Sequence, residues 1–173
     1  DAAGCRILDS ITITNPDTIT PNVTITNVDC NGNSTGRMCV DPTGGTPGYT
    51  YSWTGLLITD SCITSQAAGD YTVTITDSNS CTKTETYTIS EPTLFSSNPI
   101  STDVSCFGLT DGSAGVILSG GTAPYQCTWS TGDSKTTLFG NDTIFNLAAG
   151  PYSVTCTDTN GCVTSQNITV NQP

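Results

Sequence analysis

Short runs in which apolar and polar residues alternate dominate the chain and predict β-strands. In residues 22–26 (NVTIT), 71–76 (YTVTIT) and 167–170 (NITV), every second side chain is apolar and mostly β-branched or aromatic, as in a strand with one buried face. Gly- and Pro-rich stretches at 41–48 and 119–124 separate such runs, as turns require. No stretch combines helical spacing with capping residues. The pattern therefore predicts an all-β fold.

The sequence also repeats itself, which predicts two modules. The residues from Cys30 to Trp53 recur 76 positions later, from Cys106 to Trp129, with their cysteine, glycines, tyrosine and tryptophan in register. After a small insertion the shift becomes 81, and AAGDYTVTITDSNSC (67–81) returns as AAGPYSVTCTDTNGC (148–162). Self-similarity at a fixed period is typical of repeat architectures. We expect module 1 at residues 17–92 and module 2 at residues 93–173.

Residues 1–16 match the end of the same pattern, with Cys5 on Cys81 and Pro16 on Pro92. They are expected to be the last strand of a preceding module in a longer tandem array, or a strand donated to a neighbouring subunit. The segment supplies a third tail strand for only two module bodies, which favours the array. Pairing of an added strand with an exposed sheet edge keeps the donated strand open as an alternative.

Two longer stretches of the repeat resemble a known family. CFGLTDGSAGVILSGGTAPYQCTWSTGD and NLAAGPYSVTCTDTNGC, both within residues 106–162, resemble the SprB-type repeat of large adhesins on gliding bacteria. YSWTG (51–55) and TWSTGDS (128–134) also resemble PKD-like and bacterial Ig-like modules. The resemblance implies an extracellular β-sandwich that serves as a spacer or adhesive unit, without naming a ligand.

Nine cysteines in modules of this size predict disulfides formed in an oxidising compartment. We expect about six strands per module, in module 2 at 101–106, 113–119, 124–130, 143–147, 151–157 and 162–170. If successive strands alternate in direction, the turn after the first strand and the turn before the last lie at the same end. This predicts the pairs Cys30–Cys81 and Cys106–Cys162.

The remaining cysteines are expected to pair within their own modules, Cys39 with Cys62 and Cys127 with Cys156. Cys5 is then left for an upstream module or a neighbouring subunit. The rival pairs Cys5–Cys30 and Cys81–Cys106 would span a joint of extended modules, about two strand lengths apart and far beyond disulfide reach. Zinc ligation is disfavoured because the sequence has no CxxC pair and no histidine.

Other polar and aromatic residues are candidates for binding, each beside a structural alternative. Tyr49, Tyr125, Trp53 and Trp129 could form a sugar platform, but the spacing favours tryptophans that face the core. TDSNSC (76–81) and TDTNGC (157–162), with Asp29 and Asp103 nearby, are weak candidates for Ca²⁺ between modules. The alternative for both segments is a hairpin turn closed by aspartate.

Glycan attachment is suggested by two weak sequence patterns. N-x-S/T sequons occur at Asn22, Asn33, Asn141 and Asn167, about as often as chance predicts in a chain so rich in Ser and Thr. DSI (9–11), DTI (17–19) and DTI (142–144) resemble the O-glycosylation motif of bacteria that carry SprB-type repeats, with Ser10, Thr18 and Thr143 as acceptors.

Charge and missing motifs narrow the function classes. Four basic against fifteen acidic residues give a net charge of −11, which disfavours nucleic acid and anionic membranes. The sequence has no apolar run long enough to predict membrane insertion. It has no histidine and no recognisable catalytic motif, so we expect no enzymatic activity, no cofactor and no metal requirement beyond the weak calcium candidate.

We therefore expect a structural repeat segment of an extracellular, disulfide-stapled fibre or stalk, located at a cell surface or in a secreted filament. Its partners would be copies of itself or adjacent modules, with covalent glycans as a further prediction. An adhesin or carbohydrate-binding module, or an accessory domain of a secreted enzyme, stays as the alternative.

Overall fold

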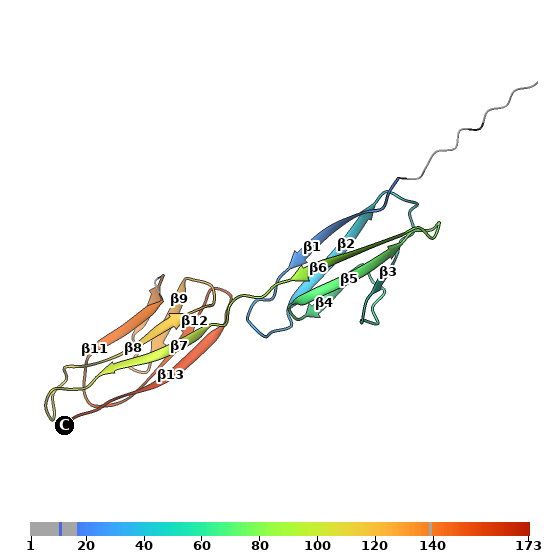
Figure 1. Cartoon of the computed structure of the whole chain (residues 1–173). Coiled ribbons are helices and arrows are strands. Elements are labelled where there is room, and N and C mark those ends of the chain that lie inside the picture. The colour runs from blue at the N-terminus through green and yellow to red at the C-terminus, as the bar shows by residue number, and fades with distance from the viewer. Residues whose placement is uncertain (1–10, 12–16, 139) are drawn as a thin grey trace, which may run out of the picture.

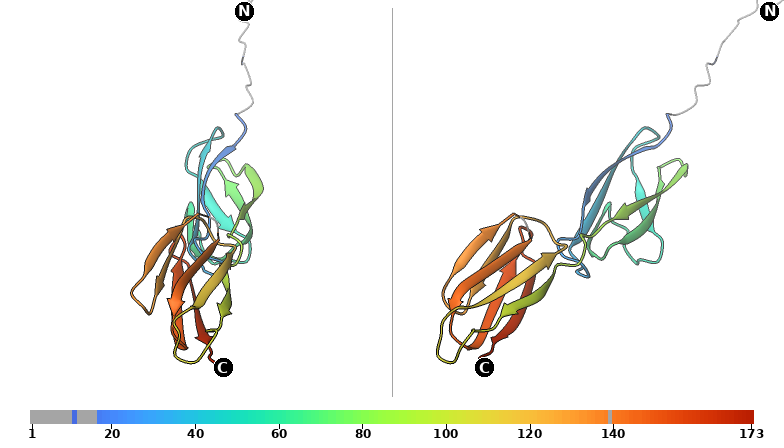
Figure 2. Two further views of the ribbon diagram at one scale, coloured as in Figure 1. Left: turned by 90° about the vertical axis from the view of Figure 1, so that its left-hand side faces the viewer. Right: turned by 60° about the vertical axis from the view of Figure 1, so that its left-hand side comes forward.

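The computed structural model describes residue 11, residues 17–138 and residues 140–173. The prediction for residues 1–16, including Cys5, lies outside this part of the chain apart from residue 11. The described residues form strands and turns without a helix, so the all-β prediction is confirmed. Two β-sandwiches follow one another along the chain, and Figures 1 and 2 show them placed end to end.

Module 1 contains six strands in two three-stranded sheets. One sheet has the order β1-β2-β4 and the other β3-β5-β6. The strands are β1 (Thr20–Thr26), β2 (Gly36–Thr43), β3 (Thr50–Trp53), β4 (Cys62–Gln66), β5 (Gly69–Thr76) and β6 (Thr82–Ile89). Alternating residues of β2 and β5, among them Met38, Val40, Val73 and Ile75, enter one shared core, as the period of two in the sequence predicts.

Module 2 repeats this plan with one strand more. Its sheets have the orders β11-β8-β7 and β10-β9-β12-β13. The strands are β7 (Ser96–Thr102), β8 (Gly112–Ser119), β9 (Tyr125–Trp129), β10 (Ser134–Thr137), β11 (Asn141–Leu147), β12 (Gly150–Thr157) and β13 (Val163–Val170). Its core is a separate cluster that includes Phe95, Val116, Trp129 and Val154.

Strand β10, which the sequence did not predict, changes the direction of the last strand of module 2 relative to the first. Because β10 pairs antiparallel with β9, and β11 antiparallel with β8, seven strands of module 2 alternate in direction, not six. The first and last strands therefore run the same way, and both end at one end of the module, where the Val104 N–H donates to the Asn171 carbonyl. In module 1 the segment 54–61 has the role of β10 without pairing as a strand.

This correction overturns two predicted disulfides. With the first and last strands parallel, the turn before the last strand lies at the opposite end from the loop after the first. The predicted pairs Cys30–Cys81 and Cys106–Cys162 are therefore wrong, and Cys30 bonds Cys162 of the other module. Among the described cysteines, Cys81 and Cys106 are free and exposed.

The disulfides private to each module are those that the sequence predicted. Cys39 and Cys62 face each other across β2 and β4, and Cys127 and Cys156 across β9 and β12. Both pairs have a Cα–Cα distance of 4.1 Å, somewhat shorter than the spacing of about 4.5 Å in the closer type of antiparallel residue pair. The disulfide within module 1 thus lies in the sheet β1-β2-β4, and that within module 2 lies in the sheet β10-β9-β12-β13.

Candidate functional site: the joint between the modules

A disulfide joins the two modules at the place where they meet. Cys30 lies in the loop 27–35 after β1, and Cys162 lies in the turn 158–162 between β12 and β13. Their Cα atoms are 5.6 Å apart, an ordinary disulfide spacing. The bond closes 132 residues of sequence separation, and Cys30 packs against the core of module 2. The joint is therefore covalent in two places, through the backbone and through this disulfide.

Asp29 organises the loop 27–35 on the module 1 side. Its Oδ1 accepts hydrogen bonds from the Cys30 N–H at 2.7 Å, the Thr35 hydroxyl at 2.8 Å and the Asn33 amide at 3.0 Å. The Asn33 and Thr35 side chains, which favour the ionised form, lower the pKa of the Asp29 carboxyl. An ionised carboxylate at the centre of the loop thus fixes the backbone that carries Cys30.

Asp158 has the matching role in the turn 158–162. Its Oδ1 accepts the N–H groups of Asn160 at 2.9 Å and Cys162 at 2.8 Å, and its Oδ2 accepts the Thr122 N–H at 2.8 Å. The Asn160 amide nitrogen then donates across the joint to the Asp29 carbonyl at 3.2 Å. Hydrogen bonds therefore hold the side chains on both sides of the joint in place, in addition to the disulfide.

The segment between the modules is also held by the loop 27–35. The Gly32 N–H donates to the Glu91 carboxylate at 2.7 Å, and the Asn31 amide donates to the Pro92 carbonyl at 3.2 Å. One step earlier, the Ser90 N–H donates to the Asn27 side chain at 3.0 Å. These bonds restrict the connecting segment, since its polar groups have partners in module 1.

A groove of about 380 Å³ runs along the joint. It is lined from module 1 by Cys30, Asn31 and Asn33 and from module 2 by Leu94, Phe95, Gly161, Cys162 and Val163. The Phe95 ring is buried and stacks on Tyr125 with centroids 5.2 Å apart. The groove has no titratable side chain among its lining residues, so it offers packing surface rather than acid–base chemistry.

The aromatic candidates are parts of the two cores. Trp53 and Trp129 are 2 % and 3 % exposed, so the prediction that the tryptophans face the core is confirmed. The hydroxyls of Tyr49 and Tyr125 donate to the carbonyls of Gly44 and Gly120. These tyrosines thus close the Gly-rich loops.

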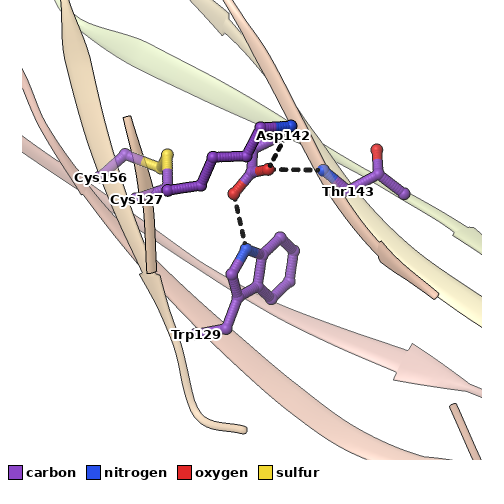
Figure 3. Close-up of polar contacts among 6 residues, drawn as sticks. Cys127, Trp129, Asp142, Thr143 and Cys156 are labelled. Carbon is purple, nitrogen blue, oxygen red and sulfur yellow. Dashed lines mark hydrogen bonds and ion pairs between the residues drawn. A yellow bond between two sulfur atoms is a disulfide. The ribbon is translucent and has the colours of Figure 1, made fainter. Parts of the chain in front are cut away.

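The two indoles find their hydrogen-bond acceptors in different ways. Trp53 Nε1 donates to the backbone carbonyl of Asp60 at 3.0 Å. Trp129 Nε1 donates to the buried carboxylate of Asp142 at 2.8 Å, and the same carboxylate accepts the Thr143 N–H (Figure 3). Lys135 Nζ lies 3.5 Å from Asp142 Oδ1. This network ties β10, β9 and β11 together in module 2 alone.

The acidic candidates for calcium hold turns. Asp77 repeats the arrangement of Asp158, because its carboxylate accepts the N–H groups of Thr46, Asn79 and Cys81. These backbone bonds, that from Thr46 foremost, lower the pKa of Asp77. Asp103 accepts the Asn171 N–H at 2.8 Å. In the described residues no group of three or more His, Cys, Asp or Glu side chains is placed to hold a metal ion.

The proposed glycan acceptors differ in their exposure to solvent. Ser10 lies outside the described residues, and Thr143 is half-buried. The other positions are exposed: Thr18, Asn22, Asn33, Asn141 and Asn167. Asn33 is engaged at the joint through Asp29, so a glycan there would have to share the loop that carries Cys30.

The sequence did not predict the joint, although signals for it were present. Gly132, whose φ is +94°, ends a tight turn in STGDSK that could have indicated the hairpin of β9 and β10. Counting that strand makes the strand number of module 2 odd and moves Cys106 away from Cys162, and the segment 54–61 has the same role between Cys30 and Cys81 in module 1. The pairing of Cys30 with Cys162 then requires only that consecutive modules meet end to end.

One family model matches the chain at two places. The model of the SprB repeat matches at residues 22–57 and again at residues 98–134. No curated protein sequence matches the chain. In the described part of the chain no helix is long and apolar enough to cross a membrane.

Several solved structures align with most of this chain, at low identity and with TM-scores below 0.5. A Dscam structure concerned with isoform specificity is 9 % identical, covers 92 % of this chain and 47 % of its own, and has a TM-score of 0.39. The C-terminal fragment of intimin, in complex with the intimin-binding domain of its translocated receptor, is 16 % identical over 91 % of this chain and 64 % of its own, with a TM-score of 0.43. The mouse nectin-like molecule 4 ectodomain is 11 % identical over 91 % and 66 %, with a TM-score of 0.42. The chain thus spans about half to two thirds of these proteins, and the likeness concerns the fold alone.

Proposed function

We propose that the chain is a repeat segment of a surface protein and serves as a structural unit of an extracellular fibre or stalk. Each of its two β-sandwiches contains one match to the SprB repeat, which supports this proposal. The joint carries this proposal. A disulfide, a hydrogen bond from Asn160 to Asp29, and an anchored connecting segment together hold two sandwiches in line. Such a joint resists bending, which is what a spacer needs and what a hinge between independent domains would lack.

The rest of the surface supports a mechanical role over a catalytic or binding one. The Gly-rich loops of both modules have backbone groups that bond within their own module, since the Thr46 N–H donates to the Asp77 carboxylate and the Thr122 N–H to the Asp158 carboxylate. SprB repeats and Ig-like modules are typically non-catalytic. We infer an oxidising, extracellular setting from the three disulfides, since such bonds persist outside the reducing cytosol.

Electron microscopy of the producing cells tests this function directly. Antibodies raised against the 173-residue chain would be used for immunogold labelling of intact cells. We expect label along thin projections that extend from the cell surface or along shed filaments. Label confined to the cell interior would refute the proposal. Saturable binding of the chain to a defined sugar on a glycan array, together with label on the cell body only, would favour the adhesin alternative.

A further inference from the structure

The two free thiols occupy the repeat-equivalent positions of the joint disulfide. Cys106 lies 76 positions after Cys30, and Cys81 lies 81 positions before Cys162, the same two shifts that relate the modules. Cys106 is therefore the loop cysteine of module 2, and Cys81 is the turn cysteine of module 1. Both thiols are exposed, and Figure 1 shows that the ends of the modules carrying them face away from the joint.

We propose that each free end is half of a further joint, so that Cys106 of one copy of this chain bonds Cys81 of a second copy seated head to tail. This inference deepens the proposed function, since it names the partner and the covalent bond through which the fibre would continue. It is carried by the geometry of the two ends and by the bond that their equivalents form.

The Cys106 end has the geometry of the Cys30 loop. The Leu109 N–H donates to the Cys106 carbonyl at 3.2 Å, as the Asn33 N–H does to Cys30 at 3.0 Å. The strand end beneath the loop also matches, because Asn171 N–H bonds the Asp103 side chain as Ser90 N–H bonds Asn27. The loop that would present Cys106 to a partner is thus formed without one.

The Cys81 end has the geometry of the Cys162 turn. Asp77 accepts the Cys81 N–H at 2.8 Å, as Asp158 accepts that of Cys162 at 2.8 Å. The amide of Asn79 points to Thr46 as that of Asn160 points to Thr122. Asn160 additionally donates across the joint, and Asn79 is exposed at the free end for the same contact.

Both ends also present unpartnered surface beside the thiol. A pocket of about 170 Å³ lies against Cys81 and is lined by Thr18 and Ile19. These are the counterparts, 76 positions earlier, of Leu94 and Phe95 in the joint groove. At the other end, Phe107 and Leu109 flank Cys106 and are 79 % and 45 % exposed. Exposed apolar side chains at one end and a pocket at the other are what a head-to-tail contact between two copies would bring together.

Bond formation requires a disulfide oxidant. The thiolate of one cysteine attacks a mixed disulfide that its partner has formed with a small-molecule disulfide, and the small thiol leaves. Over the two exchanges, two protein thiols are oxidised to one disulfide and one oxidant disulfide is reduced to two thiols. The atoms and electrons balance without a metal.

The experiment uses two complementary variants of the 173-residue chain. Cys81→Ser retains Cys106, Cys106→Ser retains Cys81, and both carry Cys5→Ser so that a single thiol remains. They are mixed in equal amounts in a buffer of reduced and oxidised glutathione and allowed to equilibrate. Intact mass spectrometry then counts the dimers, and peptide mapping verifies that Cys30–Cys162, Cys39–Cys62 and Cys127–Cys156 stay intact.

Random pairing of thiols would give the heterodimer at twice the amount of either homodimer. One complementary hydrogen bond and packed apolar contacts favour the head-to-tail pair, so we expect the heterodimer in roughly tenfold excess over each homodimer. Asn79→Ala should reduce the excess, whereas Asn98→Ala, on the exposed face of β7, should leave it unchanged.

A statistical mixture of dimers, or an excess that Asn79→Ala and Asn98→Ala change equally, would overturn the inference. The result of the dimer experiment can be distinguished from the result of the immunogold experiment that tests the proposed function. Surface filaments in cells combined with statistical dimers would leave the function and remove this joint. A specific heterodimer from a protein labelled only inside cells would do the reverse.

Discussion

The buried carboxylate of Asp142 gives the sharpest test of how module 2 is held together. Asp142 is 3 % exposed and accepts the Trp129 indole N–H at 2.8 Å. Replacing it with alanine leaves that N–H buried, because Trp129 itself is 3 % exposed. Asp142→Ala therefore removes the acceptor of a buried donor.

The size of the effect follows from the hydrogen bonds that Asp142→Ala removes. An unpaired buried donor costs about 1–3 kcal/mol, and a hydrogen bond to a charged group contributes about 1.5–3 kcal/mol. The ion pair with Lys135 adds little, since the lysine side chain is 63 % exposed. We expect module 2 to lose about 2–3 kcal/mol, which at a typical urea dependence lowers its unfolding midpoint by about 1 M.

Module 1 supplies the matched control. Trp53 donates to the backbone carbonyl of Asp60, which Asp60→Ala retains, so that variant should change stability by less than about 0.5 kcal/mol. Urea unfolding followed by peptide-resolved hydrogen exchange assigns each change to its module. Equal effects of the two substitutions, or a change below about 0.5 kcal/mol for Asp142→Ala, would refute the assignment of the carboxylate as the buried acceptor.

Three further outcomes follow from the structure. Asp77 accepts backbone N–H bonds that lower its pKa, so its contribution to stability is complete above the unfolded-state pKa of about 4 and is lost as the pH falls further. Asp77→Asn should therefore flatten the acid end of a curve of stability against pH. Ser80 adopts a φ of +67° where the other module has Gly161 at +86°. Calorimetry should therefore show that Ser80→Gly raises the free energy of unfolding and that Gly161→Ser lowers it, each by about 0.5–1 kcal/mol. Replacing Cys30 and Cys162 with serine should broaden the end-to-end distances measured by small-angle scattering and leave both modules folded, whereas replacing Cys39 and Cys62 should cost module 1 about 3 kcal/mol and leave the shape unchanged.

The sequence predicted what depends on local pattern. The alternation at 71–76 and 167–170 places Val73, Ile75, Ile168 and Val170 in the cores, and the shifts of 76 and 81 residues place equivalent strands in equivalent sheets. The pairs Cys39–Cys62 and Cys127–Cys156 were also predictable. They join strands of one sheet, where register alone brings the cysteines together.

The joint depended on a global property, the direction of the last strand relative to the first. β10 has the sequence SKTT and only its last residue is buried, so it lacks the apolar alternation by which strands are recognised. Omitting this one strand reverses the predicted direction of every strand after it and places the turn cysteine at the wrong end. In module 2 an error of four residues in secondary structure thus became an error in one disulfide, and in module 1 the unpaired segment 54–61 had the same consequence.

The shared direction of the first and last strands also explains why the repeat is suited to a linear array. A module whose first and last strands run parallel receives the chain at one end and releases it at the other, so that modules extend in line. The loop cysteine then lies at the exit end and the turn cysteine at the entry end, as Cys30 and Cys162 show. With antiparallel first and last strands, as six strands of strictly alternating direction would give, both cysteines would lie at one end and would bond within the module. The direction of one strand therefore decides whether this pair of cysteines staples a module or links it to the next.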